Sequence, residues 1–140
     1  MNPWRRGFLL RQESGNFRVM LVEDNDSFRR SLAGLLISRF PSIFLGEASD
    51  GAEAIEKVET FLPNLIFMDI KLPGQNGLEL TKTIKALHPD IHVVMLTSYD
   101  SPEYRDAARA SGAYGFLSKG SSTAEDIQEL VEKLCEKYAA

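Results

Sequence analysis

The chain has 140 residues, of which 44% are hydrophobic and 26% charged, the composition of a soluble globular protein large enough to form one domain. Sixteen basic and twenty acidic residues give a net charge of −4, which excludes an overall basic surface for nucleic acid or an anionic membrane. The single cysteine, Cys135, excludes an internal disulfide and fits a packing role in a cytoplasmic, reducing compartment. No apolar run is long enough to cross a bilayer.

Residues 1–16 differ from the regular pattern that begins at Phe17. They contain basic residues and one brief apolar patch, Gly7 to Leu10, which is too short for the core of a signal peptide. We therefore interpret residues 1–16 as a flexible N-terminal extension and residues 17–140 as one folded domain.

The folded part begins with a strand, a helix and a second strand. Residues 17–22 are a β-rich apolar run suited to a strand buried on both faces. The helix that follows can be capped by Asp26 or Ser27, and it ends before Pro41. Residues 42–48 then form a second, weaker strand.

The middle of the chain repeats this alternation. Asp50 starts the second helix, with Glu53 three residues later at the spacing of a capping box, and Pro63 stops it. Residues 64–68 form the third strand. After a loop broken by a proline and two glycines, residues 78–88 form an amphipathic helix.

The last two units follow the same order. Residues 91–96 form the fourth strand, and the next helix starts at Ser101 and stops near Gly112. Residues 113–117 form the fifth strand, and a final helix is capped at position 122 or 123. Five strand–helix units with short connections indicate an α/β fold, a doubly wound five-stranded parallel sheet.

Polar residues close four of the five apolar runs. In an open parallel sheet, ligands bind beyond the carboxyl ends of the strands. Each polar group alone is typical of a solvated turn or a helix cap. The parallel fold brings them to one end of the sheet, and we therefore expect them to form one site: Glu23–Asp24, Asp69, Thr97–Ser98 and Ser118–Lys119.

These residue types point to phosphoryl chemistry. Three carboxylates in close proximity repel one another, so the site should have raised carboxyl pKa values or bind a cation. Oxygen ligands with room for water favour Mg²⁺, which can place a phosphoryl group in line with a carboxylate nucleophile. Asp69 is the expected nucleophile, Lys119 can pair with the added charge, and Thr97 can donate its hydroxyl to a phosphoryl oxygen.

Four motifs occur in order at suitable spacing: ED after the first strand, MDIKLPGQNGLEL around Asp69, LTS at Thr97, and GFLSK ending at Lys119. Together they resemble the CheY-like receiver domain of two-component response regulators, over roughly residues 17–137. The resemblance implies a flavodoxin-like sheet with strand order 2-1-3-4-5. It also implies that Asp69 accepts a phosphoryl group, with Mg²⁺, from a histidine kinase or a phosphotransfer protein.

The resemblance also assigns the individual positions. Thr97 is similar to the switch hydroxyl, and Phe116 stands where the family carries its switch aromatic, although it lacks the hydroxyl of tyrosine. A switch here would therefore depend on packing and would alter partner binding or dimerisation. The metal site would consist of the side chains of Glu23, Asp24 and Asp69 and the backbone carbonyl of Lys71.

One departure from the family pattern points to a subgroup. Gly120 follows Lys119, where many receivers carry a cis-proline, and this is common in regulators with a LuxR-type DNA-binding output. A trans bond or a more mobile loop is then the expectation at this position. We expect no nucleic-acid or membrane binding by this chain itself, although an output domain outside it could bind DNA. The sequence fits a stand-alone receiver and a part of a longer regulator equally well.

Two other functions are weighed against phospho-acceptance. A haloacid-dehalogenase-like phosphatase needs a second carboxylate two residues after its nucleophile, and Lys71 at that position argues against such an enzyme. We expect catalysis to be confined to the chain's own phosphorylation and dephosphorylation. A receiver-like interaction module that takes no phosphate is the remaining alternative.

We further hypothesise that Lys71 and Tyr99 tune the phosphoryl lifetime by screening water.

Overall fold

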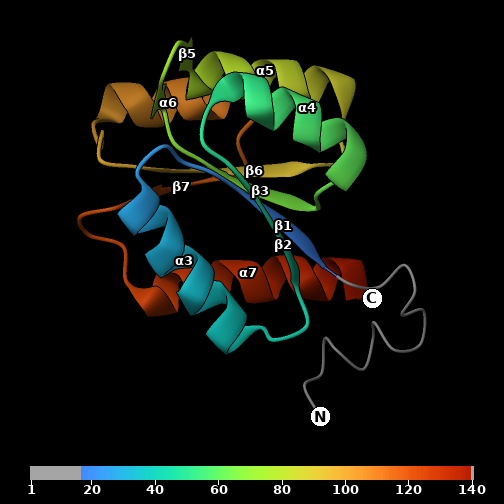
Figure 1. The fold of residues 1–140 in the computed structure, drawn as a ribbon. Helices are drawn as coiled ribbons and strands as arrows, with labels where there is room; N and C mark the ends of the chain where they lie inside the picture. Colours follow the sequence, from blue (N-terminus) through green and yellow to red (C-terminus); the bar gives the residue numbers. More distant parts are fainter. Residues whose placement is uncertain (1–16, 140) are drawn as a thin grey trace.

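A computed structural model describes residues 17–139, and the predicted extension at residues 1–16 lies outside this part (Figure 1). Five parallel strands form the main sheet: β1 (Arg18–Val22), β2 (Phe44–Ala48), β3 (Leu65–Met68), β6 (His92–Thr97) and β7 (Gly115–Ser118). The helices connect them: α3 (Asp26–Arg39), α4 (Gly51–Phe61), α5 (Gly77–Leu87), α6 (Pro102–Ala110) and α7 (Ala124–Ala139). Each strand begins and ends within two residues of its predicted bounds.

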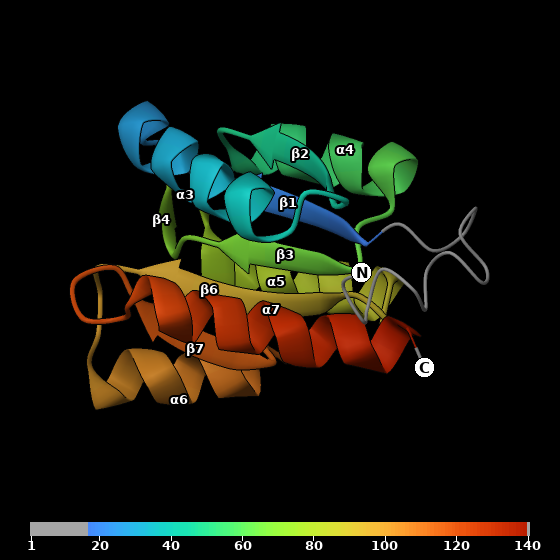
Figure 2. The ribbon, with the colours of Figure 1, turned by 90° about the horizontal axis from the view of Figure 1, so that it is seen from below.

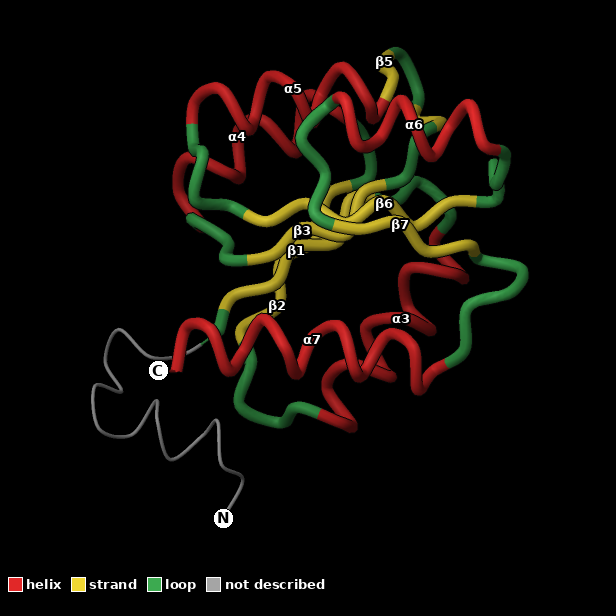
Figure 3. The backbone as a smooth tube through the Cα atoms, turned by 180° about the vertical axis from the view of Figure 1, so that it is seen from behind, coloured by secondary structure: helices red, strands yellow, loops and turns green. Residues whose placement is uncertain are grey.

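The order of the strands confirms the predicted topology. The sheet runs β2-β1-β3-β6-β7, which is the order 2-1-3-4-5 when the five parallel strands are counted along the chain. Helices α4, α5 and α6 cover one face of the sheet, and α3 and α7 cover the other (Figures 1 and 3). Figure 2 shows α3 and α7 on the face that is turned toward the viewer from below.

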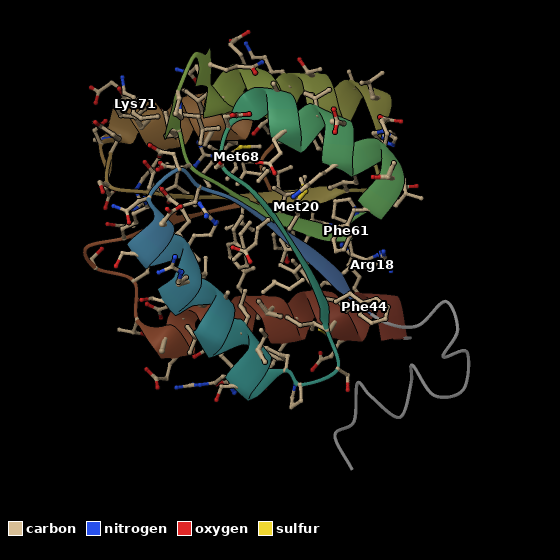
Figure 4. The ribbon with its side chains drawn as sticks, in the orientation of Figure 1. Arg18, Met20, Phe44, Phe61, Met68 and Lys71 are labelled. Atoms are coloured by element: carbon tan, nitrogen blue, oxygen red, sulfur yellow. The ribbon has the colours of Figure 1, made fainter. Side chains whose placement is uncertain are left out.

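Two apolar layers, one on each face of the sheet, hold the helices in place. Along β1, Val19 and Leu21 pack in the layer under α3 and α7, whereas Met20 and Val22 pack in the layer under α4, α5 and α6. This alternation follows from the two-residue period of a strand. Met68 of β3 shares the second layer with Met20, and both are labelled in Figure 4. The central strands β1, β3 and β6 are thus buried on both faces, as continuous apolar runs predict, whereas the edge strands β2 and β7 are only partly buried.

The first helix cap differs from the prediction. Asn25, and not Asp26 or Ser27, is the N-cap of α3, because its side-chain oxygen accepts a hydrogen bond from the Phe28 N–H at 2.9 Å. Asp26 instead lies in the first turn of the helix, where its carboxylate pairs with Arg29. The prediction is therefore wrong by one residue.

The predicted cap of α4 at Asp50 is confirmed, and the return bond of the capping box goes to Ser49, one residue before the cap. The Glu53 N–H donates to Asp50 Oδ1 at 2.8 Å, and Glu53 Oε1 accepts a hydrogen bond from the Ser49 N–H at 2.8 Å. Together these two bonds satisfy N–H groups that have no partner inside the helix. Further along the chain, Ser101 caps α6 as predicted, and Gly112 follows that helix with φ +97°.

The loop after β3 contains structure that the sequence did not indicate. Two short strands, β4 (Lys71–Leu72) and β5 (Gln75–Asn76), pair there as an antiparallel hairpin. Gly74 lies between them with φ +73°, a conformation that favours glycine. The helix α5 begins immediately after β5, and the hairpin therefore stands directly beside the carboxyl end of the main sheet.

Candidate functional site at the carboxyl end of the sheet

Backbone hydrogen bonds bring the predicted strand ends together. The Asp69 N–H donates to the Val22 carbonyl at 3.1 Å, which extends the pairing of β1 and β3 beyond the last strand residue. The Lys119 N–H donates to the Thr97 carbonyl at 2.9 Å and does the same for β6 and β7. The sheet itself therefore carries these side chains to one end, the carboxyl end of the sheet.

The three acidic side chains form a cluster. One carboxylate oxygen from each of Glu23, Asp24 and Asp69 lies within 4.8 Å of the other two. Glu23 and Asp69 are buried and Asp24 is exposed. Burial raises the pKa of the Glu23 carboxyl, and the hydrogen bond from Lys119 offsets only part of that effect. Oxygen ligands that are open to water on one side fit a Mg²⁺ ion, which keeps several of its waters.

Lys119 bridges two of these carboxylates. Its Nζ lies 2.5 Å from Glu23 Oε1 and 2.9 Å from Asp69 Oδ2. The same ammonium lies 4.5 Å from the centroid of the Phe28 ring, which shields it from one side. Burial alone would lower the pKa of the Lys119 ammonium, but the hydrogen bonds to Glu23 and Asp69 outweigh it and raise the pKa. Lys119 is therefore a charged partner of the acidic cluster.

The backbone around Asp69 is tightly constrained. Asp69 Oδ1 accepts a hydrogen bond from the Ile70 N–H at 2.7 Å, which leaves Oδ2 for Lys119. Helix α5 starts against the same segment, since the Gly77 N–H donates to the Ile70 carbonyl at 2.7 Å. A Cβ atom at Gly77 would lie 1.9 Å from the Asp69 carbonyl oxygen, so only glycine fits at this position.

Thr97, Tyr99 and Lys71 lie at the same end of the sheet. Thr97 is fully buried, and its hydroxyl oxygen accepts a hydrogen bond from the Tyr99 N–H at 3.3 Å. The Tyr99 ring is exposed, and the Lys71 ammonium lies 5.2 Å from its centroid (Lys71 is labelled in Figure 4). Lys71 is the first residue of β4, two residues after Asp69. The assignment of its backbone carbonyl to a metal stays a prediction.

Phe116 is partly buried on β7 and contacts a cation that the sequence reasoning missed. The Arg105 guanidinium lies 4.7 Å from the centroid of the Phe116 ring, and its Nε donates to Asp100 Oδ1 at 2.7 Å. This contact joins the loop after Thr97 to the predicted switch aromatic. No motif signals it, because Arg105 and Phe116 come from different elements.

Three further expectations concern the loop after Lys119 and other parts of the molecule. Within residues 17–139 no peptide bond is cis, so the Lys119–Gly120 bond is trans. Cys135 is buried, and burial raises the pKa of its thiol, which agrees with a packing role. Among the described helices, none combines the length and the apolar character that a transmembrane segment requires.

Comparisons with known proteins agree with this geometry. The family model of the response regulator receiver domain matches residues 19–134. Response regulator GacA of Pseudomonas viridiflava is 33% identical over 113 residues, which are 81% of this chain and 53% of GacA. Response regulator protein VraR of Staphylococcus saprophyticus is 36% identical over 118 residues, 83% of this chain and 55% of VraR. A solved LuxR-family two-component response regulator from Aurantimonas sp. SI85-9A1 is 28% identical with a TM-score of 0.79, covering 87% of this chain and 86% of that one.

These similarities concern the folded part of the chain. The chain spans about half the length of the two curated relatives, GacA and VraR. The matched residues 19–134 include the whole acidic cluster, Thr97 and Lys119. The LuxR-family structure agrees with the subgroup that Gly120 suggested. The chain therefore belongs to the response regulator receiver domain family.

Proposed function

We propose that this chain is a phospho-acceptor switch that receives a phosphoryl group on Asp69 from a histidine kinase or a phosphotransfer protein. In this step an Asp69 carboxylate oxygen bonds to phosphorus, the phosphorus–nitrogen bond of the donor phosphohistidine breaks, and the imidazole nitrogen keeps the electron pair. The observation that carries the proposal is the bridge from Lys119 to Glu23 and Asp69, because it holds a cation at the oxygen that would carry the phosphoryl group.

The other residues of the site would have distinct roles. Bound Mg²⁺, held by Glu23, Asp24, Asp69 and the carbonyl of Lys71, would neutralise charge on the phosphoryl oxygens. Lys119 would move from its carboxylate partners to the new phosphoryl oxygens. Thr97, which is buried beside the site, would donate its hydroxyl to one of them. Catalysis would be confined to the chain's own phosphorylation and dephosphorylation.

The output would pass through Phe116. When Thr97 moves toward the phosphoryl group, Phe116 gains room to repack, and the contact with Arg105 would open or shift. The surface of α6, β7 and α7 would then change its affinity for a partner or for a second copy of the chain. A cytoplasmic location, expected from the cysteine content, is part of this proposal.

Intact mass spectrometry tests the proposal. The chain is incubated with acetyl phosphate and Mg²⁺, beside an Asp69→Asn variant and a sample without metal. We expect one added phosphoryl group that requires both Asp69 and Mg²⁺. No mass gain with acetyl phosphate or with candidate kinases would contradict the proposal and would favour the phosphate-independent interaction module.

A further inference from the structure

Arg29 on helix α3 contacts three different parts of the chain. Its Nη1 donates to the backbone carbonyl of Glu23 at 2.6 Å, and its Nη2 donates to Asp26 Oδ1 at 2.6 Å. Its Nε donates to Glu47 Oε1 on β2 at 2.8 Å. Although its two acidic partners are well exposed, the Arg29 side chain itself is only 16% exposed. A guanidinium with all three nitrogens engaged is fixed in both position and orientation.

The carbonyl that Arg29 binds belongs to the peptide between Glu23 and Asp24. The N–H of Glu23 is held from the other side, because it donates to the Ala48 carbonyl at 3.0 Å. The next residue, Asn25, donates its N–H to Glu23 Oε2 at 3.0 Å and caps the helix that carries Arg29. Arg29 therefore fixes the one peptide plane from which the acidic pair projects.

Lysine could not make this set of contacts. Its ammonium is a single point charge, whereas the acceptors on Glu23, Asp26 and Glu47 come from the strand end, the helix and the neighbouring strand. The planar fork of arginine reaches all three at once. The exposed Arg30 is the adjacent residue and carries the same charge, so it provides a matched control.

We infer that Arg29 is a positioning residue of the Mg²⁺ site: by holding the Glu23 carbonyl it sets the directions in which the Glu23 and Asp24 carboxylates point. This inference rests on the proposed function, since it concerns the metal that the function requires. Outer-shell groups that orient metal ligands in this way typically change metal affinity by about 10-fold to 100-fold when they are removed.

The direction of the effect separates positioning from charge. Arg29 is a cation close to a cation site, so Coulomb's law alone predicts that Arg29→Met strengthens Mg²⁺ binding and that Arg29→Lys leaves it unchanged. Positioning predicts weaker binding in both variants. A role in stability alone predicts a lower melting temperature with unchanged Mg²⁺ affinity.

The test is a calorimetric titration of the full chain with Mg²⁺ at constant ionic strength, with the melting temperature of each variant recorded beside it. We expect Arg29→Lys to raise the dissociation constant about tenfold, at the lower end of the outer-shell range. Arg29→Met should raise it at least as much, and Arg30→Lys should leave it unchanged. The rate of phosphorylation by acetyl phosphate should recover in Arg29→Lys when Mg²⁺ is raised to saturation.

A second variant covers the case in which the Arg29 variants do not fold. Glu47→Asp keeps the charge but withdraws the carboxylate from Arg29 Nε, so it should weaken Mg²⁺ binding by a smaller factor. Unchanged Mg²⁺ affinity in the folded variants, or tighter binding in Arg29→Met, would overturn the inference and leave the proposed function standing. A wild-type chain that binds no Mg²⁺ would instead overturn the metal requirement of the proposed function, and the inference with it.

Discussion

Strand β1 has a partly buried cation site at each end, and the two sites are built differently. At its amino end, Arg18 lies between two rings, 5.2 Å from the centroid of Phe44 and 4.5 Å from that of Phe61 (Figure 4). Its Nε donates to the Phe61 carbonyl at 2.6 Å. At the carboxyl end, Lys119 binds two carboxylates instead.

We interpret Arg18 as a structural cation and propose that Lys119 is a functional one. The partners of Arg18 are a carbonyl and two ring faces, which carry no net charge and have nothing to offer a metal or a phosphate. The partners of Lys119 are ionisable and can take a second cation. A charge that is balanced by charge can be redistributed, whereas a charge that is packed between rings is fixed. The predictions below test this difference.

The largest effect is expected from Gly77→Ala. The new Cβ would lie 1.9 Å from the Asp69 carbonyl oxygen, and the free energy of unfolding should fall by about 3 kcal/mol, which urea titration measures. Gly46→Ala, in the middle of β2, meets only the Phe61 ring at 3.2 Å and should cost clearly less. Gly34→Ala, with no atom within 4 Å, should stabilise helix α3 by about 0.5–1 kcal/mol. Equal losses at Gly77 and Gly46 would contradict this.

Removal of the Lys119 cation should lower the free energy of unfolding by an amount that depends on Mg²⁺. Lys119→Met leaves two buried carboxylates without their partner, and we expect about 2 kcal/mol less stability in metal-free buffer. Mg²⁺ should restore part of the loss, and the variant should bind Mg²⁺ more tightly than the wild type because a competing cation is gone. Lys133→Met, at an exposed position on α7, is the control. A loss of the same size with and without Mg²⁺ would refute the functional interpretation of Lys119.

Removal of the Arg18 cation should lower the free energy of unfolding by an amount that does not depend on Mg²⁺. Arg18→Met abolishes the two ring contacts and the bond to the Phe61 carbonyl, and it should cost about 1 kcal/mol. The same urea titrations, run with and without Mg²⁺, should give equal values, and phosphorylation by acetyl phosphate should be unaffected. If Mg²⁺ rescued this variant, the two ends of β1 would not differ in the way described.

A smaller effect is expected in the pH dependence of stability. The bond from the Ser49 N–H and the pairing with Lys57 lower the pKa of Glu53 from 4.5 to about 2. A carboxyl whose folded pKa is depressed stabilises the fold above its unfolded pKa, and this contribution is lost as the pH falls from about 5 toward 2. Solvent screens this partly exposed group, so we expect Glu53→Gln to cost only about 0.5–1 kcal/mol at neutral pH. Glu56→Gln, at an exposed position on the same helix, is the control.

The smallest effect concerns the rim of the site. Tyr99→Ala removes the ring that faces the Lys71 ammonium at 5.2 Å, and Lys71→Ala removes the cation. An exposed contact of this kind contributes about 0.5–1 kcal/mol, so each variant should lose phosphoryl groups roughly threefold faster than the wild type. The decay of the phosphorylated mass after removal of acetyl phosphate measures this. An unchanged decay rate in both variants would contradict the hypothesis that Lys71 and Tyr99 shield the phosphoryl group from water.

The strong periodic signals in the sequence predicted most of the fold. Buried parallel strands need continuous apolar runs, and helices that cover them need one apolar face, so both patterns are legible without a structure. The hairpin of β4 and β5 was not predicted, because strands of two residues are too short to show a hydrophobic periodicity. The cap of α3 was misplaced because Asn25, Asp26 and Ser27 are all good cap residues, and only the geometry distinguishes them.

The site likewise contains some residues that the sequence predicted and others that it did not. The acidic cluster and Lys119 were predicted because the topology forces strand ends together. The roles of Phe28 and Arg29 were not, because each depends on a contact across elements. Phe28 lies at the helical spacing of the apolar residues of α3, and that spacing does not indicate that its ring covers the Lys119 ammonium. Arg29 stands three residues after Asp26, a common spacing for helical ion pairs, but nothing local indicates its bond to the Glu23 carbonyl.

The bridge from Lys119 would also affect the valence of the metal ion that the proposed site binds. Three carboxylates against one ammonium leave an excess of negative charge that equals the charge of one divalent cation. A single K⁺ or Na⁺ would leave the cluster with a net negative charge, and a trivalent lanthanide would give it a net positive charge. In the proposed metal-bound state, the charge of Lys119 would thus favour a divalent cation, independently of the ion's size and coordination number.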